Sequence, residues 1–352
     1  MQNTFDLQQL AGQIARWAKE LGFQGVGIAD THLQVHEAHL ENWLDNGYHG
    51  SMQWMESHGT KRSRPQELLP GTLRVISVRM DYRPEGYNPV ELLQQPEKAY
   101  ISRYALGRDY HKLIRKRLAQ LADKIADAVA SEVQQRPFVD SAPVLERAIA
   151  EKSRLGWIGK NTMLIHEKTG SWFFLGELFT NIPLPTSEEP ATNHCGSCSA
   201  CLDICPTNAF IGPYQLDARK CISYLTIEHD GSIPEELRAP MGNRIYGCDD
   251  CQLVCPWNKF SRISQEPDFA PRHRLDRANL VTLFNWTEQE FLDNLAGSAI
   301  RRIGYEKWLR NIAVALGNAP STTEVVQALE HKRQHSSKLV REHVVWALAQ
   351  HQ

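Results

Sequence analysis

The residues of this chain most suited to chemistry are its eight cysteines, which all lie between residues 195 and 255 of the 352. The first four are spaced C-x2-C-x2-C-x3-C, a fifth stands alone, and the last three are spaced C-x2-C-x3-C. A proline, Pro206 or Pro256, directly follows each run. Thiols packed so closely along the chain are typical of a site that binds a metal centre.

The first run has the spacing of bacterial ferredoxins, in which the fourth cysteine binds the other cluster of a two-cluster module. Applying this crossing rule divides the eight thiols into two complete sets. One [4Fe–4S] cluster is expected on Cys195, Cys198, Cys201 and Cys255, and the other on Cys205, Cys221, Cys248 and Cys251.

Two alternatives use the same residues. Structural zinc binds pairs of C-x2-C motifs separated by a longer loop, which three thiols at three-residue steps fit poorly. Disulfides are disfavoured because no signal peptide precedes the chain, so its thiols are expected to stay reduced. Small residues between the cysteines, such as Gly196 and Ser197, favour clusters because they let backbone N–H groups approach the sulfur atoms.

A second candidate for chemistry is Asp140, which ends a short apolar stretch before a predicted helix. From the residue alone, its ordinary role is a turn or a helix N-cap. The alternative role is a general acid whose pKa is raised by a desolvated pocket. Asp30-x-His32 begins like the motif that gives a histidine to cobalt in some cobalamin proteins, but Val35 stands where that motif has glycine.

The elements that position these residues begin with an α+β domain at residues 1–185. Apolar residues at helical spacing predict a helix at 7–21, ended by Gly22, and a long amphipathic helix at 113–133. Strands are expected at 24–29 and 73–80. Residues 163–165 and 172–180 are expected to pair with each other across a turn at 167–170.

The cysteine module is expected at residues 186–262, with a polar linker at 186–193, and an all-helical tail at 263–352. The pattern at 312–316 recurs at 344–348, a period that suits HEAT-like helix pairs, although a small helical bundle fits as well. Residues 301–352 carry eight Lys/Arg and four Asp/Glu, a net charge of +4 on a chain of net charge −2.

Composition sets broad limits on the class of protein. The chain is 42% hydrophobic and 23% charged, which is typical of globular proteins. It has no run of eighteen apolar residues and no basic region leading into an apolar stretch after Met1. We therefore expect a cytoplasmic protein without a membrane partner, acting as a monomer.

Several stretches together resemble the epoxyqueuosine reductase family of cobalamin-dependent, tRNA-modifying enzymes. They are FVDSAPVLER (138–147), GWIGKN (156–161), CPTNA (205–209), GNRIYGCDDC (242–251) and YISRYALGRDYH (100–111), and the complete cysteine frame accompanies them. The resemblance extends from about residue 100 to residue 255, and the helical tail is similar to the family's HEAT-like C-terminal region.

The resemblance implies a nitroreductase-like domain that holds base-off cobalamin, which the nearer cluster reduces. The implied reaction removes the epoxide oxygen of epoxyqueuosine at the wobble position of tRNA. Asp140 matches the family's proton donor, which favours its functional role over the N-cap role. The residues implied to contact the cofactor are Arg62, Ser102, Asp140, Lys160, Asn161, Ser223 and Asp249.

The implied partners are an epoxyqueuosine-bearing anticodon stem-loop and an external electron donor. We expect the basic tail to grip the tRNA backbone through Arg301, Arg302, Lys307 and Arg310. Two other functions remain open at this point. One is a cobalamin and iron–sulfur reductase of a small molecule, similar to reductive dehalogenases, and the other is a non-catalytic electron-transfer module.

Overall fold

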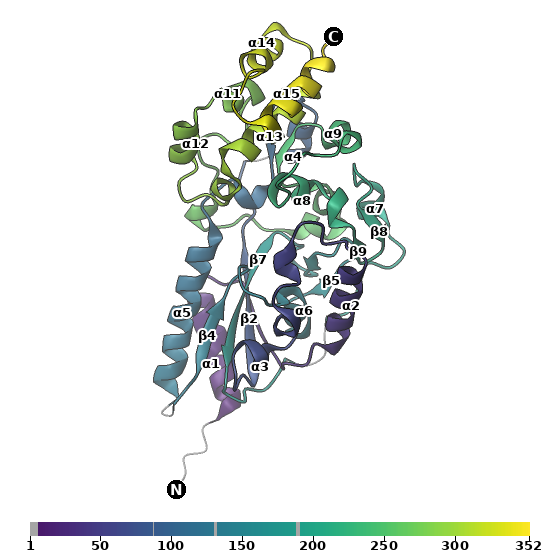
Figure 1. Ribbon diagram of the computed structural model, residues 1–352. Coiled ribbons are helices and arrows are strands. Elements are labelled where there is room, and N and C mark those ends of the chain that lie inside the picture. Colours follow the sequence, from purple (N-terminus) through teal and green to yellow (C-terminus); the bar gives the residue numbers. More distant parts are fainter. Residues whose placement is uncertain (1–5, 87, 130–131, 188–190) are drawn as a thin grey trace.

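A computed structural model describes residues 6–86, 88–129, 132–187 and 191–352 of the chain. A four-stranded antiparallel sheet lies at the N-terminal end of the molecule, the helical tail at the other end, and the cysteine module between them (Figure 1). Residues 188–190 of the expected linker lie outside the described residues.

The sheet has the strand order β1-β2-β7-β4. Its strands are β1 (Gly25–Ala29), β2 (Arg74–Asp81), β7 (Phe173–Thr180) and β4 (Gln135–Phe138). Alternate residues point to opposite faces, so Ile76 and Val78 pack under α1 (Leu7–Glu20) and α5 (Tyr110–Ala128). Val75 and Phe179 face α6 (Glu146–Lys152).

Gly176 and Gly27 allow the two helical layers to approach this sheet closely. A Cβ atom at Gly176 would lie 2.8 Å from the Ile114 side chain of α5. A Cβ atom at Gly27 would lie 1.9 Å from the backbone oxygen of Ser153, directly after α6. The sheet is therefore the middle layer between α1 and α5 on one face and α6 on the other.

The predicted helices and strands around this sheet are present apart from one pairing, although the helix expected at 113–133 is α5, which ends at Ala128. The helix expected at 7–21 is α1, and Gly22 follows it with φ +87°. The prediction that 163–165 pairs with 172–180 is wrong. β6 (Leu164–Ile165) pairs with β5 (Trp157–Ile158), while β7 is long enough to lie between β2 and β4, where both its faces are covered.

The remaining elements are short and lie mostly in the cysteine module and around it. Before the module they are α2 (Gln34–Asp45), α3 (Pro65–Leu68), α4 (Pro89–Leu93) and β3 (Tyr100–Ile101). Within it they are α7 (Ala200–Asp203), β8 (Phe210–Gly212), β9 (Gln215–Leu216), α8 (Ile222–Ile227), α9 (Glu235–Met241), β10 (Arg244–Tyr246) and α10 (Asp250–Leu253).

The tail is helical, as expected. Its helices are α11 (Leu280–Phe284), α12 (Glu288–Asn294), α13 (Gly304–Gly317), α14 (Thr323–His331) and α15 (Lys338–Ala349). The two similar segments lie on α13 and α15, which pack against each other. A Cβ atom at Gly317 would lie 2.5 Å from the Trp346 ring, so glycine permits this close contact.

Candidate active site and cluster site

The two cysteine runs lie beside each other in space. Cys201 lies on α7 and Cys251 on α10, and these two short helices pack together. Burial and then the neighbouring Cys255 and Cys195 raise the pKa of the Cys201 thiol to about 11. Cys255 is thus a neighbour of the first run although it lies more than fifty residues along the chain, as the crossing rule requires.

Cys251 of the second set lies close to cysteines of both sets. Burial is the main reason that the pKa of the Cys251 thiol is raised well above its ordinary value, and Cys221, Asp249, Cys201 and Cys205 add to the effect. The Ala209 N–H donates to Cys205 Sγ over 3.3 Å. Thiolates gathered in this way repel one another, so the chemistry of both donor sets fits a centre that supplies compensating positive charge.

Lys160 and Asn161 connect the N-terminal domain to both cysteine runs. Lys160 Nζ donates to the backbone oxygens of Gly196 (2.7 Å) and Cys198 (2.9 Å). Asn161 Nδ2 donates to the backbone oxygen of Cys251 (3.2 Å). Both residues therefore hold the cluster loops in place, and their contact with a cofactor stays a prediction.

Asp140 lies in the loop between β4 and α6. It does not cap α6, whose N-cap is Leu145, so the N-cap interpretation is wrong. Its backbone has φ +52°, a conformation that residues other than glycine adopt rarely. Its side chain is 58% exposed, and Oδ2 accepts a hydrogen bond from the Tyr110 hydroxyl over 2.6 Å.

His111 joins Asp140 to a second carboxylate. The His111 Nδ1 lies 2.6 Å from Asp109 Oδ1, and Nε2 lies 3.3 Å from Asp140 Oδ2. Burial acts to lower the pKa of His111, but the hydrogen bonds to Asp109 and Asp140 outweigh it and raise the pKa to about 9. His111 is therefore an imidazolium at neutral pH.

The expected raised pKa of Asp140 is wrong for this arrangement. Burial acts to raise that pKa, but hydrogen bonds from His111 and Tyr110 hold it below the ordinary value. The transferable proton accordingly lies on His111, one hydrogen bond away from Asp140. His111 and Tyr110 were not predicted as site residues, although the Asp109-x-His111 spacing permits their contact.

The other residues expected to contact a cofactor occupy different surroundings. Arg62 is buried, stacks on Trp54 and donates to the Trp54 backbone oxygen, while its Nε has no partner among the described residues. Ser102 Oγ donates to Asp249 Oδ1 over 2.6 Å, and both side chains are buried. Ser223 lies near the start of α8, two residues after Cys221.

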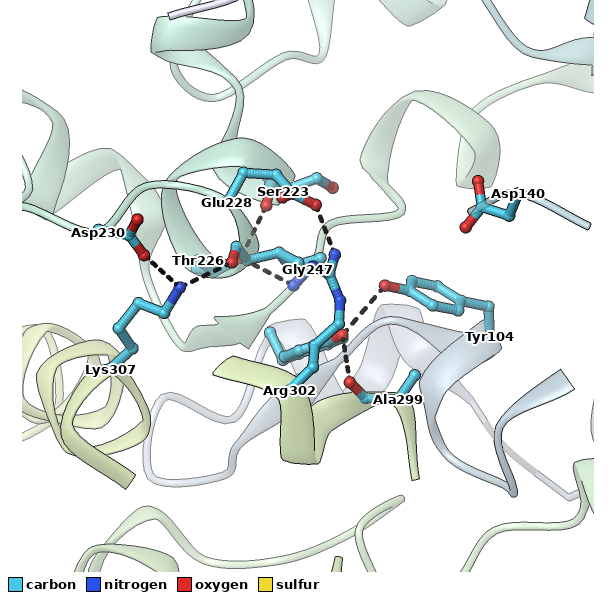
Figure 2. A network of polar contacts seen from close by, with 12 residues as sticks. Tyr104, Asp140, Ser223, Thr226, Glu228, Asp230, Gly247, Ala299, Arg302 and Lys307 are labelled. Carbon is cyan, nitrogen blue, oxygen red and sulfur yellow. Dashed lines mark hydrogen bonds and ion pairs between the residues drawn. The ribbon is translucent and has the colours of Figure 1, made fainter. Parts of the chain in front are cut away.

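Of the four basic residues expected on the tail, Arg301 and Arg302 are exposed, whereas the Lys307 side chain is only 16% exposed. Arg302 makes a 2.5 Å ion pair with Glu228, and Tyr104 lies between it and Asp140 in the view of Figure 2. Lys307 pairs with Asp230 over 2.7 Å.

Arg310 requires a correction. Its side chain is fully buried and donates to the backbone oxygens of Leu225, His229 and Gly231. A guanidinium that is satisfied inside the protein cannot bind phosphate, so Arg310 holds α13 against the cysteine module. The basic cluster expected from the sequence is reduced to Arg301, Arg302 and Lys307.

Two sets of cysteine donors and a hydrogen-bonded Asp140–His111 pair suit an iron–sulfur oxidoreductase, and comparison with known proteins agrees. Residues 194–258 match a family of 4Fe-4S double cluster binding domains, and residues 62–141 match the family described as Epoxyqueuosine reductase QueG. No helix among the described residues is both long and apolar enough to cross a membrane.

Relatives over nearly the whole chain are more specific. The epoxyqueuosine reductase of Pseudomonas aeruginosa is 62% identical over 98% of this chain and 96% of its own length. The epoxyqueuosine reductase of Escherichia coli is 56% identical over 99% of this chain and 92% of its own length. The crystal structure of an epoxyqueuosine reductase with an epoxyqueuosine-modified tRNA-Tyr stem loop has a TM-score of 0.89 and 28% identity, over 98% of this chain and 91% of its own.

The chain belongs to the epoxyqueuosine reductase family, and it reduces epoxyqueuosine in tRNA.

Proposed function

We propose that Asp140 protonates the oxygen that leaves epoxyqueuosine at the wobble position of tRNA. The observation that carries this proposal is the contact of Asp140 Oδ2 with both the Tyr110 hydroxyl and the His111 imidazolium. Removal of the epoxide oxygen breaks two C–O bonds, forms a C=C bond, consumes two electrons and two protons, and releases water. An alkoxide is a poor leaving group, so a positioned acid is expected.

The proton route runs through named atoms. As the leaving oxygen takes a proton from Asp140, His111 Nε2 donates its own proton to Asp140 Oδ2 in the same step, because Asp140 does not keep a proton by itself at neutral pH. Asp109 Oδ1 holds the other ring nitrogen, so that the ring keeps its orientation and regains a proton from solvent, to which its side chain is 26% exposed. Tyr110 fixes the rotamer of the Asp140 carboxylate during this transfer.

The cofactor of the proposed reaction is cobalamin, which supplies reduced cobalt for cleavage of the C–O bonds. A nitroreductase-like N-terminal domain would hold it beside the Asp140 loop, with Arg62 and Ser223 as contacts. The buried Nε of Arg62, which lacks a partner among the described residues, fits a polar group of such a ligand. The charge of Glu146, just beyond the Asp140 loop, also acts on Arg62, which places Arg62 near that loop.

Electrons are proposed to enter at the first cluster set and leave from the second. Cys198 is exposed, so the set that contains it is open to an external donor. Cys221 and Cys248 are more buried, and Ser223 and Asp249 adjoin them in sequence. The crossed ligation also places Cys255 in the first set, which ties the two sites together.

The tRNA is proposed to lie across the surface that joins the Asp140 loop to the HEAT-like tail. Arg302 supports this placement because its charge acts on Asp140 from the short 3-10 helix Ala299–Ile303, just before α13. Arg301 and Lys307 would then track the phosphates of the anticodon stem. We propose that the protein acts in the cytoplasm, where it meets its tRNA substrate, and that it acts as a monomer.

The substitution Asp140→Asn tests the proposal, because the amide keeps the shape but cannot take up a proton from His111 and pass it to the leaving oxygen. We expect clusters and cobalamin to remain bound while the single-turnover rate falls by ~10²–10⁴-fold, the range of general acid catalysis. Asp276→Asn is a matched control in the tail. A rate for Asp140→Asn equal to that of the wild type would overturn the assignment.

A further inference from the structure

A second carboxylate lies buried in the centre of the sheet, beneath the Asp140 loop. Glu177 on β7 is fully buried and stands in register between Ser77 on β2 and Phe138 on β4. The Ser77 hydroxyl donates to Glu177 Oε1 over 3.2 Å. Glu177 Oε2 has no hydrogen-bond partner among the described residues as long as every carboxyl is ionised.

Glu146, the first residue of α6, supplies the missing partner. The carboxyl groups of Glu146 and Glu177 are near enough to each other to share a hydrogen bond once one of them is protonated. Two ionised carboxylates cannot form such a bond, so one of them carries a proton. Burial and the charge of Asp140 raise the pKa of Glu146 to about 7, and burial together with Glu146 raises the pKa of Glu177 still further.

The same Glu146 side chain holds the Asp140 loop. Glu146 Oε1 accepts the backbone N–H of Asp140 over 2.5 Å. Asp140 has φ +52°, so its conformation has to be fixed by such contacts. A 28% identical epoxyqueuosine reductase of Bacillus subtilis, with a TM-score of 0.88, was solved with its catalytic aspartate loop swung out of the active site.

We propose that Glu146 is the positioning residue of the Asp140 loop, and that Glu177 keeps it in place by sharing one proton with it. This inference rests on the proposed role of Asp140. When the pair loses its shared proton, two buried charges face each other. Glu146 then turns away, and the Asp140 N–H loses its acceptor.

Other charged groups around the pair modulate this step. The groups that face it are Asp140 in the loop, Tyr110 and His111 on α5, Arg147 on α6 and Arg62 before α3. Asp140 opposes ionisation of Glu146, and His111 favours it. Ser77 favours ionisation of Glu177.

Hydrogen exchange of the Asp140 backbone amide in the holoenzyme measures directly whether this N–H is hydrogen-bonded to Glu146. Glu146→Ala removes the acceptor, and we expect the protection of this amide to fall at least tenfold and the single-turnover rate to fall ~10–100-fold. Glu146→Gln keeps an acceptor for Asp140 and a donor for Glu177, so it should restore both quantities near neutral pH. Unchanged protection in Glu146→Ala would refute the proposal.

Glu177→Gln tests the shared proton without removing the hydrogen bond, because its amide donates permanently to Glu146. In the wild type, the protection of the Asp140 amide should fall as the pH rises above neutrality. In Glu177→Gln it should stay constant over the same range. Identical pH profiles in the two proteins would refute the sharing of a proton, even if Glu146→Ala does not fold.

The double variant Asp140→Asn/Glu146→Ala separates this inference from the proposed function. Because Glu146 acts only through Asp140, the double variant should be no slower than Asp140→Asn alone. If Asp140→Asn turns over at the wild-type rate, the proposed function fails. If Asp140→Asn is inactive while Glu146→Ala keeps its rate and its protected amide, only the positioning role fails.

Discussion

Replacing His111 with glutamine should separate two roles of His111, which are to hold Asp140 by a hydrogen bond and to supply it with a proton. Glutamine keeps a hydrogen-bond donor for Asp140 but cannot deliver a proton at neutral pH. In the wild type, the proton remains on His111 up to about pH 9, because Asp109 and Asp140 stabilise the imidazolium. The rate of the protonation step should therefore be constant below pH 9 and fall tenfold for each further pH unit.

In His111→Gln, Asp140 has to hold the proton alone. An aspartate with an ordinary pKa of about 3.9 is protonated in only ~0.1% of molecules at pH 7. The wild-type pair holds its proton on His111 at pH 7, but protonated Asp140 is the stronger acid, so we expect a loss of up to ~10³-fold at pH 7, within the range of general acid catalysis. The loss should shrink about tenfold for each unit by which the pH is lowered toward 4.

His111→Gln should also alter how the free energy of unfolding depends on pH. The rise in the pKa of His111 to about 9 corresponds to ~3 kcal/mol favouring the folded protein with a charged imidazolium. This stabilisation is complete below about pH 6.5 and is lost as the pH rises through about 9. Urea unfolding of His111→Gln should accordingly lack that part of the pH dependence.

The assay is single turnover of the reduced holoenzyme on an epoxyqueuosine stem-loop between pH 5 and 10, with the product measured by mass spectrometry. His331→Gln, at an exposed position at the end of α14, is the matched control and should behave as the wild type. A rate of His111→Gln that does not increase toward acid pH would show that Asp140 does not receive its proton from His111.

Three further predictions concern the clusters, the tail and the cofactor. Cys255→Ser should remove the cluster expected on the first run, so that iron falls from about eight to about four atoms per chain; full iron content would disprove crossed ligation. Arg301→Glu should weaken tRNA binding and lower the salt dependence of that binding by about one unit of slope, as measured by filter binding. Arg310→Met should leave that slope unchanged but cost ~1–3 kcal/mol of stability, as measured by urea unfolding, because it leaves buried carbonyls without their donor. Electron paramagnetic resonance of the cob(II)alamin form should show no strong nitrogen splitting, because the motif that supplies an axial histidine is incomplete, with Val35 in place of its glycine. Such splitting would contradict base-off binding.

The cysteine frame could be read from the sequence because its spacing is local and specific. Cys255 is assigned to the first run by the ferredoxin rule that the last cysteine of each run binds the other cluster. In the structure, the charge of Cys255 acts on the nearby Cys201 thiol. The helices were equally accessible, because α1 and α5 bury one face against a sheet and so carry a clear period of 3.6 residues.

The proton-carrying groups could not be found in this way, because their environment comes from segments far apart in the sequence. Asp140 was expected to have a raised pKa from burial alone, yet His111 on α5 reverses the direction. Glu177 lies within an apolar strand. Its neighbours along the chain do not indicate that Glu146, at the start of α6, faces it from the helix that packs on the sheet. Charge counting failed at Arg310 for the same reason.

The cores explain why the expected domain boundaries do not separate three independent packing units. Residues 99–106, which precede the expected first boundary, share a hydrophobic core with β10 and with the tail helices. β3 pairs with β10 in parallel, and Arg310 and Asn311 of α13 hydrogen-bond to the backbone of α8 and β10. The segment that carries Ser102, the segment that carries Cys248 and the tail therefore support one another. A tail that packs in this way fixes the distance between its exposed arginines and Asp140, as an enzyme must when it holds a large nucleic acid and acts on a single base.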